Sequence, residues 1–231
     1  MPHAINQATP SDTQAARSAM VDSQIRPNKV TEPRLIAALR SLPREAFLPP
    51  SLQAWAYADD DVKLGAGRVM VSPMVTARLL QAAAVQPGEA VLLVGAGTGF
   101  TAALLAELGG VVTALEEDAA LLAIARPALA AVAPAVTLVQ GGLAEGWPAG
   151  RPYDLIVIEG SVEQLPEAIT AQLAPQGRLM MVRAGQGRVG SANVGQAVIG
   201  RPTQGGISFA PLFDAAVATL PALRRAPAFV F

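Results

Sequence analysis

The feature that most constrains this chain is an apolar run that ends in closely spaced glycines, Val91-Leu92-Leu93-Val94-Gly95-Ala96-Gly97-Thr98-Gly99-Phe100. A short apolar run of this kind is typical of a buried strand, and the residues after the glycines have the pattern of a helix. Glycines let the backbone turn sharply and let a ligand approach closely, because they carry no Cβ. The segment therefore predicts a strand, a turn and a helix, with a ligand site at the carboxyl end of the strand.

Further apolar strands alternate with helices along the chain. Strands are predicted at 90–94, 111–115, 136–139, 155–158 and 178–182. Helices are predicted at 15–24, 32–42, 73–84, 101–108, 119–132 and 166–173, with Thr31 and Ser72 as N-caps, whereas 55–68 is predicted to be irregular. Continuously apolar strands separated by helices indicate an α/β fold. We expect a Rossmann-like, doubly wound, mostly parallel sheet with helices on both faces, an N-terminal helical extension, and antiparallel C-terminal strands near 197–199 and 207–209.

The composition excludes several kinds of site. The 231 residues include no cysteine and a single histidine, His3, which excludes disulfides, thiolate catalysis, cysteine-ligated zinc and histidine-based catalysis. Lys and Arg number 17 against 18 Asp and Glu, and no basic stripe indicates a nucleic-acid partner. The longest charge-free apolar stretch of interest, 90–106, falls short of the roughly 20 residues of a membrane span, and residues 1–17 lack the pattern of a signal peptide. We therefore expect a cytoplasmic protein with no metal, no nucleic acid and no membrane partner.

An acidic residue follows the glycine loop at an informative distance. Glu116 ends the next predicted strand, 21 residues after Gly95, and an acid that binds ribose hydroxyls is expected after roughly 20. Dinucleotide sites favour G-x-G-x-x-G, whereas this chain has G-x-G-x-G with Phe100 at the later glycine position. No lysine follows the glycines as it does in a phosphate-binding P-loop. The loop and the acid together favour S-adenosylmethionine, which has no phosphates.

Several phrases outside the loop resemble those of one family. They are Met20-Val21 with Gln24-Ile25-Arg26, Pro43-Arg44-Glu45-Ala46-Phe47, Ala56-Tyr57-Ala58-Asp59, Gly146-Trp147-Pro148, Pro152-Tyr153-Asp154, Gln172-Leu173 with Gly177-Arg178-Leu179, and Phe209-Ala210-Pro211-Leu212. In these phrases the chain is similar to the protein-L-isoaspartate O-methyltransferases. The resemblance implies S-adenosylmethionine as cofactor, S-adenosylhomocysteine as its product, and methylation of isoaspartyl carboxylates in damaged proteins.

The resemblance also implies a division of the chain. Residues 1–14 are expected to form a flexible tail and 15–231 a single methyltransferase domain. Within that domain, 15–70 would contain the N-terminal helices and the substrate loop, and 71–231 the cofactor-binding core and the C-terminal strands.

The chain departs from the family at several contact positions. In the family's substrate loop, Gly-Gln-Thr-Ile-Ser-Gln-Pro, the serine is the residue usually called catalytic; here that position is Val71, and Arg68 replaces the glutamine. Leu93 stands where the family often has an acid for the methionine amino group, and Gly142-Leu143 replaces the pair whose acid contacts adenine. Because the carboxylate nucleophile is already ionised, methyl transfer needs no general base, and orientation can supply roughly 7–11 kcal/mol. Val71 therefore need not abolish the reaction.

The predicted site combines the loop, the strand ends and the resemblance. Cofactor contacts are predicted for Met70, Gly95, Ala96, Gly97, Gly99, Glu116, Glu117, Gly142, Leu143 and Glu159. Substrate contacts are predicted for Asp59 and Arg68, and the catalytic position is assigned to Val71, where the family serine is lost, or to Ser72 one place later. No metal ligands are predicted.

Three functions stay open at this point. The first is an isoaspartyl methyltransferase that acts on a protein or peptide carboxylate. The second is a divergent methyltransferase with another acceptor, because the substrate loop is changed. The third is a degenerate member that binds the cofactor, or nothing, and serves as an interaction protein. We expect a monomer or a homodimer.

Overall fold

A computed structural model of the chain describes residues 10–189 and 192–225. Its helices are α1 (Pro10–Met20), α2 (Pro33–Ser41), α3 (Pro73–Ala83), α4 (Phe100–Glu107), α5 (Ala119–Val132) and α6 (Glu167–Thr170). Its strands are β1 (Val62–Gly65), β2 (Arg68–Met70), β3 (Ala90–Val94), β4 (Val111–Glu116), β5 (Thr137–Gln140), β6 (Tyr153–Val162), β7 (Leu173–Val189), β8 (Ala192–Thr203) and β9 (Gly206–Ala216). Short helical turns join several of these elements.

Seven of the strands form one sheet in the order β5-β4-β3-β6-β7-β8-β9. Strands β5, β4, β3, β6 and β7 pair parallel with one another, whereas β8 pairs antiparallel with both β7 and β9. The chain order reverses at β3, which pairs with β4 on one side and with β6 on the other. In sheets of this kind, ligands bind outside the carboxyl ends of the strands at the point of reversal. A ligand site is therefore expected at the carboxyl ends of β3, β4 and β6.

The side chains of β3 alternate between two hydrophobic clusters. Val91 and Leu93 pack into the cluster that contains the N-terminal helices, and Leu92 and Val94 pack into the cluster on the opposite side. All four side chains have no exposed surface. Because successive residues of a strand point to opposite faces, a strand covered on both faces needs an unbroken apolar run. This is the physical basis of the pattern at 91–94.

The predicted fold class is confirmed, but some element bounds differ. Helix α1 begins at Pro10, inside the predicted tail, and residues 1–9 lie outside the described residues. Glu32 rather than Thr31 caps α2, because the Glu32 side chain accepts a hydrogen bond from the Arg34 amide. The predicted helix 166–173 is only the single turn α6. The C-terminal strands are antiparallel as expected, but β7 is far longer than the predicted 178–182, because it pairs with β6 from Leu173 and with β8 up to Val189.

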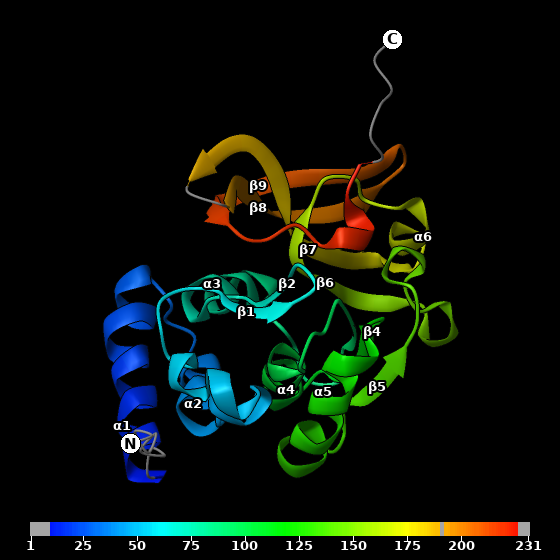
Figure 1. Ribbon diagram of the computed structural model, residues 1–231. Helices are drawn as coiled ribbons and strands as arrows, with labels where there is room; N and C mark the ends of the chain where they lie inside the picture. The colour runs from blue at the N-terminus through cyan, green and yellow to red at the C-terminus, as the bar shows by residue number, and fades with distance from the viewer. Residues whose placement is uncertain (1–9, 190–191, 226–231) are drawn as a thin grey trace.

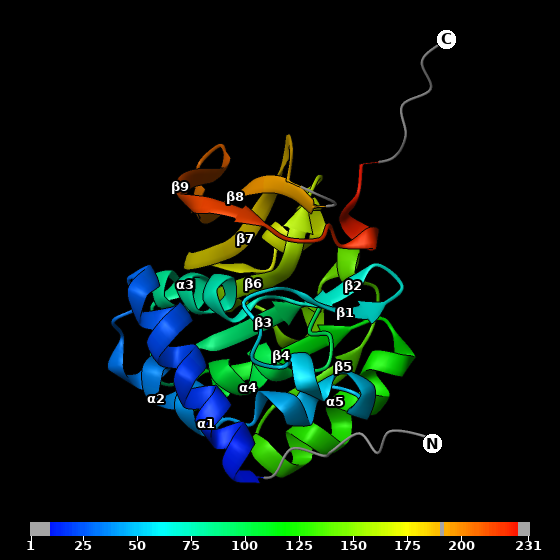
Figure 2. The same ribbon diagram turned by 60° about the vertical axis from the view of Figure 1, so that its left-hand side comes forward.

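The segment 55–68, predicted to be irregular, contains most of a β-hairpin. Strands β1 and β2 pair antiparallel around a turn in which Gly65, Ala66 and Gly67 all have positive φ. Figures 1 and 2 both show this hairpin, in cyan, beside the red C-terminal turn Pro221–Leu223. A Cβ built on Gly67 would lie 3.5 Å from Cγ of Pro221, so the two segments lie side by side. Within the described ranges, no helix has the length and apolar character that a membrane span requires.

Candidate active site

After β3, the glycine loop adopts backbone conformations that only glycine adopts readily. Gly95, Gly97 and Gly99 have φ values of 78°, 57° and 98°, a region in which side chains with a Cβ are strained. The amides of Gly95 and Ala96 both donate to the carbonyl of Leu115 at 2.9 Å, which ties the loop to β4. A Cβ built on Gly97 would lie 3.9 Å from Leu64 Cδ1, an ordinary van der Waals distance, so the positive φ rather than crowding favours glycine here.

Gly99 serves packing within the protein. It is the N-cap of α4, and a Cβ built on it would lie 3.0 Å from Cγ and Cδ1 of Leu129 on α5. We expect Gly99→Ala to lose the roughly 1–2 kcal/mol that a left-handed conformation costs a residue with a Cβ, and about 1–3 kcal/mol more from overpacking against Leu129. Urea unfolding measures the sum.

The matched control is Gly88→Ala. Gly88 has a φ of 84°, but a Cβ built there meets nothing within 4 Å. It should therefore show the conformational cost alone. Equal losses for the two variants would mean that the contact with Leu129 does not explain why residue 99 is glycine.

Glu116 lies at the end of β4 and is completely buried. Its Oε2 accepts from the amide of Gly97 at 2.7 Å, and its Oε1 accepts from the amides of Glu117 and Asp118 at 2.9 and 3.0 Å. Backbone donors of this kind fix the orientation of a carboxylate. The residue predicted to bind ribose is thus beside the glycine loop, as the spacing indicated.

Arg68, from β2, reaches the same carboxylate. Its Nη1 donates to Glu116 Oε1 at 2.6 Å and its Nη2 to Glu116 Oε2 at 2.8 Å. Nη2 also donates to the carbonyl of Gly95 at 3.0 Å. The two side chains are only 4% and 0% exposed, so this is a bidentate ion pair inside the protein. Arg68, predicted to contact substrate, therefore lies against the loop and the acid predicted for the cofactor.

A C-terminal segment covers the same strand ends. The amide of Leu220 donates to the carbonyl of Ser161 at 3.0 Å, and the amide of Ser161 donates to the carbonyl of Ala218 at 3.0 Å. The hydroxyls of Ser161 and Thr219 share a hydrogen bond of 2.9 Å. A Cβ built on Gly95 would lie 3.2 Å from the Leu220 side chain. Leu220 thus packs directly on the glycine loop.

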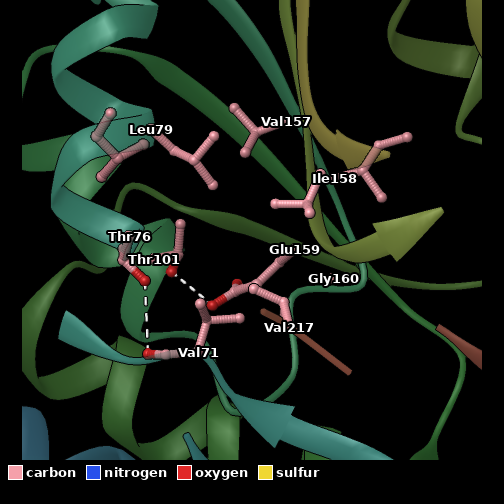
Figure 3. A pocket seen from close by; sticks show the side chains of 11 residues that line it. Val71, Thr76, Leu79, Thr101, Val157, Ile158, Glu159, Gly160 and Val217 are labelled. Carbon is pink, nitrogen blue, oxygen red and sulfur yellow. Dashed lines mark hydrogen bonds between the residues drawn. The ribbon is translucent and has the colours of Figure 1, made fainter. Parts of the chain in front are cut away.

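Glu159 follows the ends of the parallel pairing between β3 and β6, and its side chain is directed into a small cavity (Figure 3). The hydroxyl of Thr101 donates to its Oε1 at 2.7 Å, whereas its Oε2 has no partner among the described residues. Burial raises the pKa of Glu159 to about 7. The cavity, which Val71 and Val217 also line, has a volume of only about 10 Å³. It can hold at most about one water molecule.

Arg44 is a fully buried charge near this cavity. Its Nε donates to the carbonyl of Ala56 at 2.8 Å and its Nη2 to the carbonyl of Val71 at 2.7 Å. Its guanidinium carbon lies 4.8 Å from the centre of the Phe100 ring. Burial lowers the pKa of Arg44 to about 10, and the charge of Glu159 opposes this shift. Arg44 therefore anchors the segment that carries Val71.

The substrate-loop residues divide between the core and the surface. Met70 and Val71 are buried, whereas Asp59 is exposed. Ser72 occupies the predicted N-cap of α3, but its side chain makes no capping hydrogen bond. Its amide instead donates to Oδ1 of Asp61 at 2.7 Å. Burial raises the pKa of Asp61 to about 6.

Gly142 and Leu143, at the family position whose acid contacts adenine, come after β5, and Glu117, a predicted cofactor contact, comes after β4. Glu117 and Gly142 are exposed, and Leu143 is buried. The amide of Leu143 donates to Oε2 of Glu117 at 3.4 Å. Leu93 is buried in β3 and offers no polar group.

Sequence reasoning missed two residues of this site. Arg44 was noticed only as part of a family phrase, since a lone arginine in a helical segment carries no signal of burial. Leu220 lies in the apolar stretch Val217-Ala218-Thr219-Leu220-Pro221, which shows no chemistry of its own. Only tertiary contacts identify either residue.

The comparisons with known proteins agree with this geometry. A family model described as protein-L-isoaspartate(D-aspartate) O-methyltransferase matches residues 15–212. The chain belongs to this family. A protein-L-isoaspartate O-methyltransferase of Methylorubrum extorquens is 40% identical over 74% of this chain and 75% of its own length. Protein-L-isoaspartate O-methyltransferase 1 of Rhodopseudomonas palustris is 42% identical over 72% of this chain and 69% of its own length.

Two solved structures share the fold. A protein-L-isoaspartate O-methyltransferase has a TM-score of 0.73 and 21% identity, and the match covers 90% of this chain and 67% of that chain. A Plasmodium falciparum protein described as a member of the same family, in complex with S-adenosyl-L-homocysteine, has a TM-score of 0.72 and 16% identity, over 89% of this chain and 98% of that chain. The family resemblance and the Rossmann-like fold predicted from sequence are therefore confirmed.

Proposed function

We propose that this chain is an S-adenosylmethionine-dependent O-methyltransferase that methylates isoaspartyl carboxylates in proteins or peptides. The observation that carries the proposal is the match of residues 15–212 to the isoaspartyl methyltransferase family. The glycine loop and Glu116 support it, because they lie at adjoining strand ends where such a cofactor binds.

The backbone of the site fits a nucleoside cofactor. A Cβ built on Gly97 would meet no atom closer than 3.9 Å, and Glu116 is held by three backbone amides, of which that of Gly97 belongs to the glycine loop. Glu116 would accept hydrogen bonds from the ribose hydroxyls, and Gly95 and Gly97 would allow close approach of the methionine portion. When bound, S-adenosylmethionine supplies a sulfonium methyl group that a carboxylate oxygen of the substrate attacks in one displacement.

The residues of the chain would then position the reactants and exclude water. Val71 gives the substrate carboxylate no hydrogen bond where the family has serine, a loss of roughly 1–3 kcal/mol if that carboxylate is buried. Asp59, exposed at the surface, remains a proposed substrate contact. The proposed partner is a protein or peptide carboxylate, and a monomer or homodimer in the cytoplasm remains our expectation.

A methyl-transfer assay tests the proposed function. The purified chain is incubated with methyl-labelled S-adenosylmethionine and a peptide that contains one isoaspartyl residue. We expect a base-labile methyl ester on that peptide and none on the matched peptide with normal aspartate, because the proposed site discriminates the position of the carboxylate. The label released on mild base treatment measures the ester.

The other outcomes separate the rival functions. Label on another carboxylate or on an amine, with none on the isoaspartyl peptide, would favour the divergent methyltransferase. Absence of label from every acceptor would contradict methyl transfer and favour a degenerate family member. The buried pair of Arg68 and Glu116 is the observation that supports a degenerate family member as the alternative.

A further inference from the structure

The carboxylate proposed to bind ribose already has a cationic partner. Arg68 donates to both oxygens of Glu116, at 2.6 and 2.8 Å. Three backbone amides donate to the same two oxygens. A carboxylate has about four lone-pair sites, and five donors already surround this one. Ribose hydroxyls therefore have no free acceptor on Glu116 while Arg68 is in place.

The guanidinium is also well matched to this position. A planar guanidinium binds a carboxylate through two parallel hydrogen bonds, a strong and geometrically specific arrangement. The third contact, from Nη2 to the carbonyl of Gly95 at 3.0 Å, fixes the guanidinium against the glycine loop. The turn of the hairpin that carries Arg68 lies beside Pro221, 3.5 Å from where a Cβ on Gly67 would stand. The ion pair is therefore supported by the surrounding backbone.

Leu220 fills the neighbouring space. A Cβ built on Gly95 would lie 3.2 Å from Leu220 Cδ1, and one built on Gly160 would lie 2.6 Å from Leu220 Cγ. Two backbone hydrogen bonds to Ser161 hold this segment along the end of β6. The adjoining cavity at Glu159 has only about 10 Å³, too little for a methionine chain. The Leu220 side chain thus occupies the space beside both Gly95 and Gly160.

We infer that Arg68 is an internal competitor of the cofactor, and that Arg68 and Leu220 together set the affinity of the site. The cofactor enters only when the guanidinium leaves Glu116 and Leu220 leaves Gly95. The apparent dissociation constant is then the intrinsic constant divided by the fraction of molecules in the open form. This inference rests on the proposed function for the identity of the cofactor.

Calorimetric titration with S-adenosylhomocysteine tests the inference without requiring activity. Arg68→Gln restores the residue of the family loop, and its amide can still donate one hydrogen bond to Glu116. We expect this variant to bind at least about tenfold more tightly than the natural chain, since its site is open in a larger fraction of molecules. Leu220→Ala should also tighten binding, by about threefold or more.

Arg178→Gln is the matched control. Arg178 makes a comparable bidentate pair with Glu89, at 2.8 and 2.7 Å, and also contacts the carbonyls of Ala83 and Ala84 at the end of α3. Its loss should lower stability and leave the affinity for S-adenosylhomocysteine unchanged. A gain in affinity for both arginine variants would indicate general loosening of the chain and would overturn the inference.

The remaining outcomes are also decisive. Equal affinity of the natural chain and Arg68→Gln, or no binding by either, overturns the inference. If Arg68→Gln does not fold, the Leu220→Ala variant tests the inference instead. Unchanged affinity of that variant for S-adenosylhomocysteine overturns the inference. If Arg68→Gln binds tightly but forms no methyl ester on any acceptor, the inference stands and the proposed function fails.

Discussion

Arg68→Met is expected to lower the free energy of unfolding by about 3–5 kcal/mol, because it leaves the Glu116 carboxylate buried without its cation. The side chains of the pair are 4% and 0% exposed, so water cannot take the place of the guanidinium without rearrangement. The three backbone donors to Glu116 remain and favour the lower end of that range. Urea unfolding monitored by circular dichroism gives the free energy directly.

A double-mutant cycle separates the pair from the packing of Arg68. Removal of one partner of a buried pair is costly, whereas removal of both is often close to neutral. Arg68→Met combined with Glu116→Gln should therefore be more stable than the sum of the two single losses implies, by roughly 2 kcal/mol or more. Additive losses would show that the two side chains do not stabilise each other, and would weaken the case for an ion pair that closes the site.

Glu159→Gln is expected to raise the free energy of unfolding at pH 8 by about 3 kcal/mol and to change it little at pH 4.5. The physical reason is burial, which raises the pKa of Glu159 from 4.5 to about 7 in the folded chain. The amide mimics the protonated acid, since its oxygen can still accept the hydrogen bond from Thr101. Urea unfolding of the natural chain and the variant, at several pH values, provides the comparison.

The sign follows from the protons bound in each state. Between pH 4.5 and 7 the folded chain holds a proton on Glu159 that the unfolded chain has lost, so stability falls as the pH rises through this range. Above about pH 7 both states are ionised and the loss is complete. Arg44 and Arg68 lower the pKa of Glu159 and Glu116 raises it, and these effects are smaller than that of burial.

The difference in free energy of unfolding between the natural chain and Glu159→Gln reports on Glu159 alone. Asp61 also has a raised pKa, about 6, and contributes a similar decline with pH, but it is present in both chains and cancels. A difference that stays constant from pH 4.5 to 8 would mean that Glu159 does not titrate as a buried acid. A loss of stability in the variant at pH 8 would mean that the charged form is the stabilising one, through Arg44.

Local patterns were sufficient for the central sheet. The run Val91-Leu92-Leu93-Val94 predicted β3 correctly, because a strand buried on both faces can be built only from apolar residues. The spacing to Glu116 correctly placed an acid beside the glycine loop. The helix at 119–132 was predicted with its observed bounds because its apolar pattern is long, and in the structure Asp118 caps it.

Segments whose structure depends on distant partners were harder to predict. The β1–β2 hairpin is short, and its turn lies against Pro221, far away in the sequence. Strand β7 extends well beyond 178–182 because antiparallel pairing with β8 satisfies its backbone groups. Such pairing is a property of the sheet and leaves little trace in either segment alone.

The sequence by itself determined the fold, the family, and the presence of a glycine loop and an acid at adjoining strand ends. It did so because burial on both faces and glycine-only backbone angles restrict which residues are allowed. Only the tertiary structure decided that Arg68 lies on Glu116 and that Leu220 lies on Gly95. The first contact joins residues 48 positions apart in the sequence, and the second joins residues 125 positions apart. Which side chains lie against the glycine loop therefore depends on which distant segments folding brings together.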